Sequence, residues 1–488
     1  MAITPAQADQ LKRLASDAMR THGLVPDFPA AALAEANAAT VATESDSAIR
    51  DLRALPWSSI DNDDSLDLDQ IEVAEALGGG KSKLMVGIAD VDSVVRAGTA
   101  VDEHAGTNTT SVYTAAEIFA MLPERLSTNL TSLVQDQDRL CVVIEMNIDA
   151  NGTLGQSALY RALVRNRAKL AYRSVAAWLQ GKAAAPSRVG AVAGLDAQLR
   201  LQDTIAQALK GQRQAKGALE FDTAENRAVY EGAVLVDLQP DPKNRAQQLI
   251  EEFMIAANGV TARFLQQHGR TSLRRILRTP KRWDRIVQLA KDAGAILPDA
   301  PDALALNAFL TTQQKSDPSH FADLSLAVIK CLGAGEYAAE RPGETPEGHF
   351  GLAVRDYTHS TAPNRRFPDL LTQRLVKAVL KNQPPPYSDT ELPTLASHCT
   401  EQESNAKKVE RQIEKSAAAM LLGSLIGARF EGIVTGASEK GTWVRIENPS
   451  VEGRVVKGFQ GFDVGNHVQV QLLHVDVARG FIDFAGVR

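Results

Sequence analysis

The last 60 residues of the chain carry the pattern that most restricts its fold. Five short apolar segments follow one another there, and each is bounded by a turn that contains glycine. They are residues 430–436, 441–446, 453–456, 467–472 and 480–484. Short β-branched or aromatic runs between glycine-bearing turns are typical of strands. Five strands of this length predict a small closed barrel of the oligonucleotide-binding (OB) type. In such a barrel Trp443 is a candidate platform for stacking on nucleic-acid bases.

The length of the chain and its N-terminal segment indicate further domains. With 488 residues, the chain exceeds the roughly 250–300 residues at which a single core stops growing. Residues 5–22 have apolar side chains at helical spacing, with Thr4 as a possible N-cap and Gly23 after the last turn. An alanine-rich segment after Pro29 predicts a second helix. We therefore expect residues 1–56 to form a small helical element that docks on the remainder.

The middle of the chain predicts both strands and helices. Residues 84–91 and 140–148 are apolar and β-branched, as in buried strands. Residues 160–275 have mainly helical periodicity, and a long helical segment from about residue 401 to 428 precedes the barrel. The fold class expected from this order is α+β.

The composition of the chain says more about its cellular compartment than about its binding partner. No segment approaches the roughly 18 consecutive apolar residues of a membrane-spanning helix, and the N-terminus lacks the layout of a secretory signal. Cys141, Cys331 and Cys399 are few and far apart, which favours reduced thiols in a cytoplasmic protein. The net charge of −6 gives no global sign of nucleic-acid binding, so any evidence for it must be local.

A dense acidic segment precedes the first buried strand. Five carboxylates lie within nine positions: Asp61, Asp63, Asp64, Asp67 and Asp69. In an extended chain, Asp67 and Asp69 share one face, and the alternating Leu66 and Leu68 would anchor the other. Mg²⁺ binds carboxylate oxygens and joins them to substrate phosphates, where it can assist displacement at phosphorus. The segment thus indicates phosphodiester chemistry, with a solvated acidic loop as the plainer alternative.

A series of motifs, taken in order, resembles the ribonuclease II / ribonuclease R (RNB) family of exoribonucleases. They are Asp61 with Asp67-Leu68-Asp69, and residues 86–91, 111–113, 121–127, 133–140, 251–258 and 357–369. The resemblance implies an RNB catalytic domain at 57–385, with a mixed β-sheet and surrounding helices. A helical connector at 386–428 and an S1 RNA-binding domain at 429–488 would follow. The segment 1–56 is similar to the helix-turn-helix-like element that replaces cold-shock domains in some members.

The resemblance also implies an activity and a set of site residues. The activity is processive 3′-to-5′ hydrolysis of single-stranded RNA to nucleoside 5′-monophosphates, with Mg²⁺ or Mn²⁺ as cofactor. Asp61, Asp67 and Asp69 would hold the metal, and Asp69 would also position the attacking water. Arg365 would stabilise charge on the phosphate, unless it forms a buried ion pair with Asp369 instead.

Several residues are expected to contact the RNA. By resemblance they are Tyr113, Tyr172, Glu251, Arg365 and Arg366, to which the barrel adds Trp443. Packing in the core is the alternative for the tyrosines, and a charge at a helix N-terminus is the alternative for Glu251. Basic runs at 161–173 and 263–282 could line a groove that follows the RNA backbone, or could be solvated helix faces. We expect single-stranded RNA as the partner, no membrane association and a monomer.

Departures from the family pattern leave a second function open. Gln70 stands where members usually carry an Asp, and its neutral amide is a weaker metal ligand than a carboxylate. Asp63 or Asp64 could substitute for the missing ligand. Ala362 and Asn364 also depart from the family's arginine motif. The alternative function is therefore a non-catalytic single-stranded RNA-binding protein with a degenerate RNB site.

Overall fold

The structure is a computed structural model that describes residues 3–44, 46–222, 226–232, 234–318, 320–438 and 441–487. Its body is built on a seven-stranded sheet with the order β1-β8-β7-β4-β3-β2-β9. The strands are β1 (Arg50–Asp51), β2 (Ser58–Asp61), β3 (Gln70–Gly78), β4 (Lys81–Ala89), β7 (Asp138–Ile148), β8 (Leu154–Arg165) and β9 (Ala168–Ala171). The two runs predicted as buried strands are the adjacent central strands β4 and β7, which pair antiparallel. The parallel pairs β1–β8 and β2–β9 make the sheet mixed.

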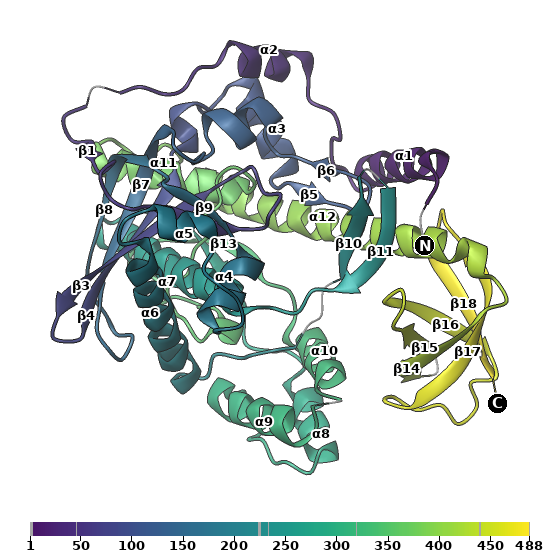
Figure 1. The fold of residues 1–488 in the computed structure, drawn as a ribbon. Coiled ribbons are helices and arrows are strands. Elements are labelled where there is room, and N and C mark those ends of the chain that lie inside the picture. The colour runs from purple at the N-terminus through teal and green to yellow at the C-terminus, as the bar shows by residue number, and fades with distance from the viewer. Residues whose placement is uncertain are drawn as a thin grey trace.

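Helices surround this sheet (Figure 1). They are α3 (Ala100–Asn108), α4 (Tyr172–Leu179), α5 (Ser187–Ala191), α6 (Leu195–Ala215), α7 (Arg245–Gln267) and α11 (Phe367–Leu380). Their apolar faces join the strands in one core that includes Trp57, Phe253 and Leu371, all fully buried. A separate cluster around Trp283 and Phe309 packs α8 (Trp283–Asp292), α9 (Ala303–Ser316) and α10 (Phe321–Leu332) together.

The expectation of mainly helical structure over residues 160–275 was partly wrong. This stretch also contains the end of β8, β9, the hairpin β10 (Asn226–Glu231) and β11 (Val234–Pro240), and β12 (Ser272–Ile276). Strand β12 pairs with β13 (Glu336–Glu340), and β5 (Val112–Tyr113) pairs with β6 (Ile118–Phe119). Pairing with a distant segment, as in β12–β13, adds hydrogen bonds that local periodicity does not register.

The N-terminal element has the two predicted helices, α1 (Pro5–Thr21) and α2 (Ala30–Ala38). Thr4 and Gln7 form a capping box at the start of α1, and Gly23 has the positive φ of +74° that lets the chain turn after it. Helix α1 packs against α12 (Glu391–Leu422), which begins earlier than predicted. Pro393 is tolerated because it lies in the first turn of α12, where its missing N–H breaks no helical hydrogen bond.

The C-terminal strands close into the predicted five-stranded barrel, in the order β14-β15-β16-β18-β17. They are β14 (Arg429–Ser438), β15 (Gly441–Ile446), β16 (Val451–Lys457), β17 (His467–Asp476) and β18 (Phe481–Val487). Helix α12 runs from the body to this barrel (Figure 1). The Ser450 N–H also donates to the Leu238 carbonyl of the β10–β11 hairpin at 3.1 Å. Among the described helices, none has the length and apolar character needed to cross a bilayer.

Candidate active site

The acidic segment forms a loop between β2 and β3, and backbone contacts fix its shape. Ser132 Oγ accepts a hydrogen bond from the Leu68 N–H at 3.0 Å and donates one to the Leu66 carbonyl at 2.7 Å. The Asp69 carbonyl accepts from the Ala89 N–H of β4 at 2.9 Å. Leu68 is buried as predicted, but the prediction for Leu66 was wrong because its side chain is 57% exposed. The polar contacts of Ser132 hold the loop where a leucine anchor was expected.

Asp69 is the meeting point of two segments that lie far apart in the sequence. Its Oδ1 accepts a hydrogen bond from the Asn364 N–H at 2.9 Å, and Arg365 Nε lies 3.4 Å from its Oδ2. Both partners lie in the loop that leads into α11. Burial raises the pKa of Asp69 to about 7, although Arg365 and the Asn364 amide oppose this rise. The site thus combines a buried carboxyl with a half-exposed guanidinium beside it.

Two further aspartates of the loop share this environment. Burial raises the pKa of Asp61 to about 6, which the hydrogen bond from Gln70 opposes. Burial also raises the pKa of Asp67. The charge of Arg365 and a hydrogen bond from the Tyr113 hydroxyl oppose this rise. The charge of Asp67 acts on both other carboxyls, so Asp61 and Asp69 both lie within electrostatic reach of Asp67.

Unsatisfied oxygens indicate that this loop fits a divalent cation. Asp61 Oδ2 and Asp69 Oδ2 are buried and accept no hydrogen bond from the described residues, and the nearest cation given for them is Arg365, whose Nε lies 3.4 Å from Asp69 Oδ2. A buried carboxylate oxygen without a partner is costly unless a cation or a donor approaches it. Within the described chain, no three His, Cys, Asp or Glu side chains form a ready-made metal cage. Mg²⁺ needs no such cage, because it commonly uses one or two carboxylates together with waters and substrate phosphates.

Gln70 faces the acidic loop, where the family usually has a carboxylate. Its Nε2 donates to Asp61 Oδ1 at 3.3 Å. The proposed substitutes Asp63 and Asp64 are both exposed, and the Asp63 backbone carbonyl accepts a hydrogen bond from Lys169. Neither carboxylate therefore occupies the place of the missing acid.

Gln70→Asp should strengthen Mg²⁺ binding, because a charged ligand replaces an amide that donates to Asp61. We expect a dissociation constant lower by about threefold to tenfold, measured by calorimetric titration of the whole protein. Asp63→Asn is the matched control, since it removes an exposed carboxylate of the same loop. An unchanged titration of folded Gln70→Asp protein would show that position 70 does not act on the cation.

The neighbouring arginines 365 and 366 have different surroundings. Arg366 Nη2 donates to Asp369 Oδ1 at 2.7 Å, and this carboxyl also accepts from the Thr361 and Ala362 N–H groups. The ion pair with Asp369 that was considered for Arg365 is thus made by Arg366. The Arg365 side chain remains 43% exposed and can reach a ligand.

Two tyrosines border the acidic loop. Tyr113 on β5 is 43% exposed, and its N–H donates to the Glu410 carboxylate of α12 at 2.9 Å. Burial of its hydroxyl, together with the charges of Asp67 and Asp69, raises the pKa of Tyr113 to about 12. Tyr172 follows β9, whose Ala171 pairs with Asp61. Burial and the charge of Asp61 raise the pKa of Tyr172.

Two predicted RNA contacts lie apart from this cluster. Glu251 lies beyond the first turn of α7, where its carboxylate accepts from Lys243 Nζ at 2.6 Å, and no described contact joins it to the acidic loop. Trp443 lies on the outer face of β15, because the alternate residues 442, 444 and 446 are buried. An added Cβ at Gly436 or Gly441 would lie 3.2 or 3.1 Å from its ring, so the indole covers these glycines.

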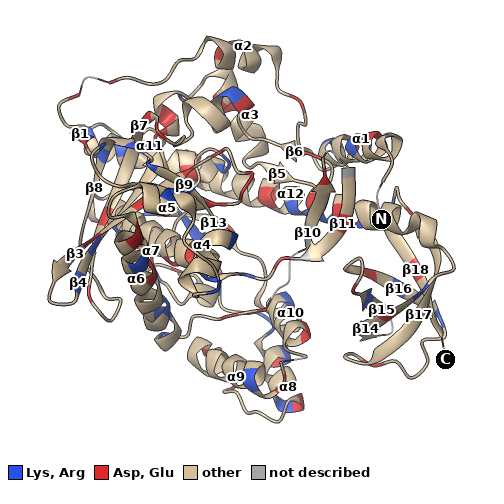
Figure 2. Ribbon diagram, viewed as in Figure 1, with Lys and Arg blue, Asp and Glu red and all other residues tan. Residues whose placement is uncertain are grey.

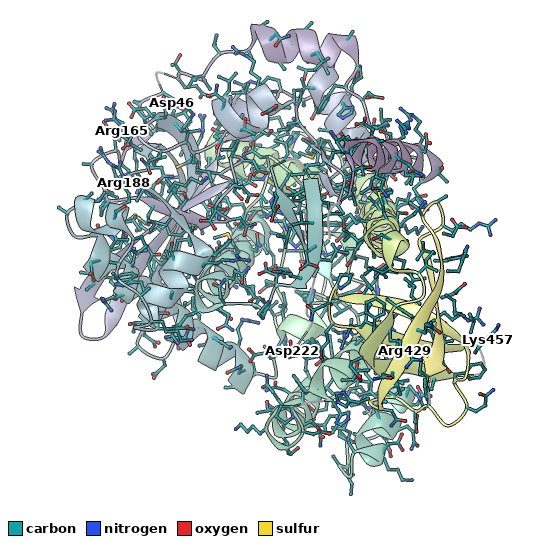
Figure 3. All side chains as sticks on the ribbon, turned by 45° about the vertical axis from the view of Figure 1, so that its right-hand side comes forward. Asp46, Arg165, Arg188, Asp222, Arg429 and Lys457 are labelled. Carbon is teal, nitrogen blue, oxygen red and sulfur yellow. The ribbon has the colours of Figure 1, made fainter. Side chains whose placement is uncertain are left out.

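Four arginines of the basic runs form ion pairs that hold the fold together, whereas Arg173, Arg278, Lys281 and Arg282 are exposed. Arg161 is buried between Glu44 and Asp90, while Arg274 and Arg275 pair with Glu340 and Glu403: these contacts are all shorter than 3.2 Å. Figure 2 shows acidic and basic residues interspersed over the body. Arg165 pairs with Asp138 at 2.6 Å, and Figure 3 shows it at the edge of the body away from Arg429 of the barrel. These four arginines are therefore engaged in ion pairs, and the possible lining of a groove by the exposed members of the two runs stays a prediction.

Binding of Mg²⁺ should weaken as the pH falls. The raised pKa values of Asp61 and Asp69, about 6 and about 7, mean that both carboxyls hold protons below that range in the metal-free protein. A cation must displace these protons, so affinity should decline between about pH 8 and pH 5.5. Titration calorimetry in buffers of different ionisation enthalpy should detect proton release near pH 6.5 and almost none near pH 8.5. Affinity that is constant over this range would contradict the assignment.

Comparison with known proteins identifies the family to which this fold and site belong. The RNB domain profile matches residues 49–382, and the profile of the RNase II-type exonuclease C-terminal S1 domain matches residues 428–487. The chain therefore belongs to the RNB family, and its barrel is an S1 domain.

Among individual relatives, the chain is similar to ribonuclease R of Vibrio cholerae, with 31% identity over 459 residues. That match covers 90% of this chain and 54% of the relative. Ribonuclease R 1 of Lactococcus lactis is 27% identical over 511 residues, covering 98% of this chain and 61% of the relative. The chain thus spans little more than half the length of these relatives.

Solved structures share the fold at low sequence identity. RNase R of Mycoplasma genitalium, solved with ribose-methylated single-stranded RNA, matches with a TM-score of 0.87 and 22% identity, covering 98% of this chain and 78% of that one. Yeast Ssd1, described as a pseudonuclease, matches with a TM-score of 0.73 and 15% identity, covering 95% and 58%. The same fold therefore occurs both in an RNase R and in a pseudonuclease.

Proposed function

We propose that this protein is a processive 3′-to-5′ exoribonuclease that hydrolyses single-stranded RNA to nucleoside 5′-monophosphates with Mg²⁺ or Mn²⁺. The observation that carries the proposal is the buried Asp69, whose unsatisfied Oδ2 lies beside the half-exposed guanidinium of Arg365. The RNB and S1 matches support RNA as the substrate class. Three buried cysteines without disulfide bonds fit a reducing compartment, which we take to be the cytoplasm.

The chemistry follows from the arrangement of charges. Asp61, Asp67 and Asp69 would hold the divalent cation, which supplies positive charge to the phosphate and activates water. The Arg365 guanidinium would donate two parallel hydrogen bonds to phosphate oxygens and stabilise the charge that develops there. Asp69 would orient the attack, because the Asn364 N–H fixes its carboxyl. Tyr113 and Tyr172 would contact the bases or riboses of the reacting end.

The rival function is RNA binding without catalysis. Gln70 favours it, as does the shared fold of the pseudonuclease Ssd1. Against it, Asp61, Asp67, Asp69 and Arg365 are all present, and the structure brings them into one electrostatic cluster. Incubation of the purified protein with a 5′-end-labelled oligoribonucleotide, with and without EDTA, separates the two. An exoribonuclease should shorten the strand from its 3′ end when EDTA is absent and leave it intact when EDTA is present. A strand that stays intact under both conditions would support RNA binding without catalysis.

Tyr113 and Trp443 should affect different stages of degradation. Tyr113→Ala should lengthen the final undegraded fragment by one or a few nucleotides, because an aromatic near the acidic loop holds the last bases by stacking worth about 1–3 kcal/mol. Trp443→Ala should weaken capture of long strands by about tenfold and leave the final fragment unchanged. Product ladders and filter binding on labelled oligoribonucleotides measure both effects. The reverse result, with each variant showing the other's effect, would contradict these roles.

A further inference from the structure

A cavity at the edge of the large sheet is lined mainly by arginine. It has a volume of about 500 Å³, and its lining residues are Asp51, Arg53, Ala54, Arg165 and Arg167. They come from β1, the segment after it, the end of β8 and the turn before β9. Figure 3 shows Arg165 on the side of the molecule away from Arg429 and Lys457 of the barrel. The cavity is thus distinct from the barrel surface and from the acidic loop.

Two acids do not balance the three guanidinium groups of this cavity. Arg53 pairs with Asp51 at 2.6 Å and with Asp138 at 2.9 Å. Arg165 Nε donates to the same Asp138 at 2.6 Å. Arg167 pairs with no acid among the described residues, and its Nη2 donates to the Arg53 carbonyl at 2.5 Å. Three positive charges share two negative ones, so the cavity keeps a net positive charge.

Two of these arginines keep unused donors. Nη1 and Nη2 of Arg165, and Nε and Nη1 of Arg167, form no hydrogen bond with the described residues. The backbone of Arg167 is fixed, because its N–H donates to the Trp57 carbonyl at 2.8 Å and its carbonyl accepts from Arg188 Nε at 2.9 Å. A planar guanidinium matches two oxygens of a phosphate group. The cavity therefore offers prearranged donors to such an anion.

Arg374 shows the contrast with an arginine that only holds the fold together. It is 4% exposed, and each of its side-chain nitrogens donates to a described acceptor, among them Asp92 and Asp102. Arg165 and Arg167 are instead partly exposed and line a hollow. A bound anion would give their unused donors the acceptors that the fold does not supply.

Strand β2 connects this cavity to the acidic loop. The Arg167 N–H is bonded to Trp57, which lies directly before β2, and Asp61 is the last residue of that strand. Four residues of extended chain span about 13 Å. Between the two sites, Lys169 Nζ donates to the Asp63 carbonyl at 3.1 Å. A nucleotide released at the acidic loop would therefore meet a positively charged cavity one strand length away.

We propose that this cavity binds the phosphate group of a nucleoside 5′-monophosphate, at a site separate from the candidate active site. A phosphate monoester carries about two negative charges near pH 7, whereas each phosphodiester of RNA carries one, so a cavity of net positive charge favours the monoester. Its volume lies in the range of small-molecule sites. The origin of the nucleotide as a reaction product rests on the function proposed above, but the anion site itself does not.

The test is titration of the whole protein with AMP in the presence of EDTA, followed by phosphorus NMR. EDTA removes divalent cations, so the acidic loop cannot hold phosphate through a metal. AMP and UMP should bind with similar affinity, inorganic phosphate should compete, and adenosine should not bind. Arg165→Met and Arg167→Met should each weaken AMP binding by about tenfold, because each removes a charged donor. Arg167→Lys should retain part of the affinity, since it keeps the charge without the planar fork.

Arg200→Met is the matched control, because Arg200 is an exposed arginine of α6 that pairs with Asp196 and does not line the cavity. It should leave AMP binding unchanged, and urea unfolding checks that every variant is folded. Parent-like AMP affinity in either folded methionine variant would overturn the inference, as would equal binding of adenosine. Tighter binding of an oligoribonucleotide without terminal phosphates, lost in the same variants, would assign the cavity to the RNA backbone instead.

RNA hydrolysis by the same variants separates this site from the proposed function. Both methionine variants should degrade RNA at the parent rate, and loss of hydrolysis in a folded variant would contradict a separate site. A parent protein that binds AMP through these arginines but never degrades RNA would support the anion site and contradict the exoribonuclease function alone.

Discussion

Asp69→Asn is expected to abolish RNA hydrolysis while leaving RNA binding intact or stronger. The Asn side chain keeps an oxygen that can accept the hydrogen bond from the Asn364 N–H, so the loop should hold its shape. The substitution removes the charge that a divalent cation and an oriented water require. We expect the rate to fall by at least about 10³-fold, which corresponds to about 4 kcal/mol of barrier.

Single-turnover assays on end-labelled RNA measure this rate, and filter binding at the same salt concentration measures affinity. Asp63→Asn is the control, because it neutralises an exposed carboxylate of the same loop and should degrade RNA at the parent rate. Degradation by Asp69→Asn at the parent rate would show that the reacting centre lies elsewhere. Loss of binding and hydrolysis together would indicate a disturbed fold.

The second large effect is a contrast between two adjacent arginines. Arg365→Ala should slow hydrolysis by about 10²-fold to 10³-fold without a loss of stability, because its guanidinium is half-exposed and is assigned to the phosphate. Arg366→Ala should instead destabilise the protein by about 3 kcal/mol. It leaves Asp369, which is 0% exposed, without its cation, and Asp369 also holds the N–H groups of Thr361 and Ala362.

Urea unfolding and single-turnover rates on the same samples separate the two outcomes. Arg365→Lys refines the contrast, because a lysine keeps the charge but cannot donate in parallel to two oxygens, and only part of the rate should return. Equal stability losses for both alanine variants would mean that Arg365 is structural. If the Arg366→Ala variant is slow but fully stable, the phosphate contact belongs to Arg366, and its assignment to Arg365 is wrong.

Much of the fold could be predicted from the sequence where local pattern and burial coincide. The barrel strands, the central pair β4 and β7, and helix α1 were confirmed because each has an unbroken periodicity and its own turn or cap residues. The hairpin β10–β11 and the strand β12 were not anticipated. Their stability depends on partners across a hairpin or 68 residues away, as in the pairing of Ser272 with Glu340, and local periodicity does not indicate such partners.

The candidate site was predictable by residue type but not by geometry. The sequence pointed to Asp69 and Arg365, yet it contained no sign that the Asn364 backbone would hold Asp69 or that Ser132 would replace Leu66 as the anchor of the loop.

Helix α12 sets a length scale for any strand of RNA that contacts both ends of the molecule. The 12 residues from Glu410, which holds the strand that carries Tyr113, to the last helical residue Leu422 correspond to a rod of about 18 Å, and α12 contacts β17 and β18 of the barrel. An unbroken helix keeps a constant length, whereas the end-to-end distance of a flexible linker varies. The distance between the barrel and the acidic loop is therefore fixed. The length of the shortest RNA that contacts both is set by this distance and not by the nucleotide sequence.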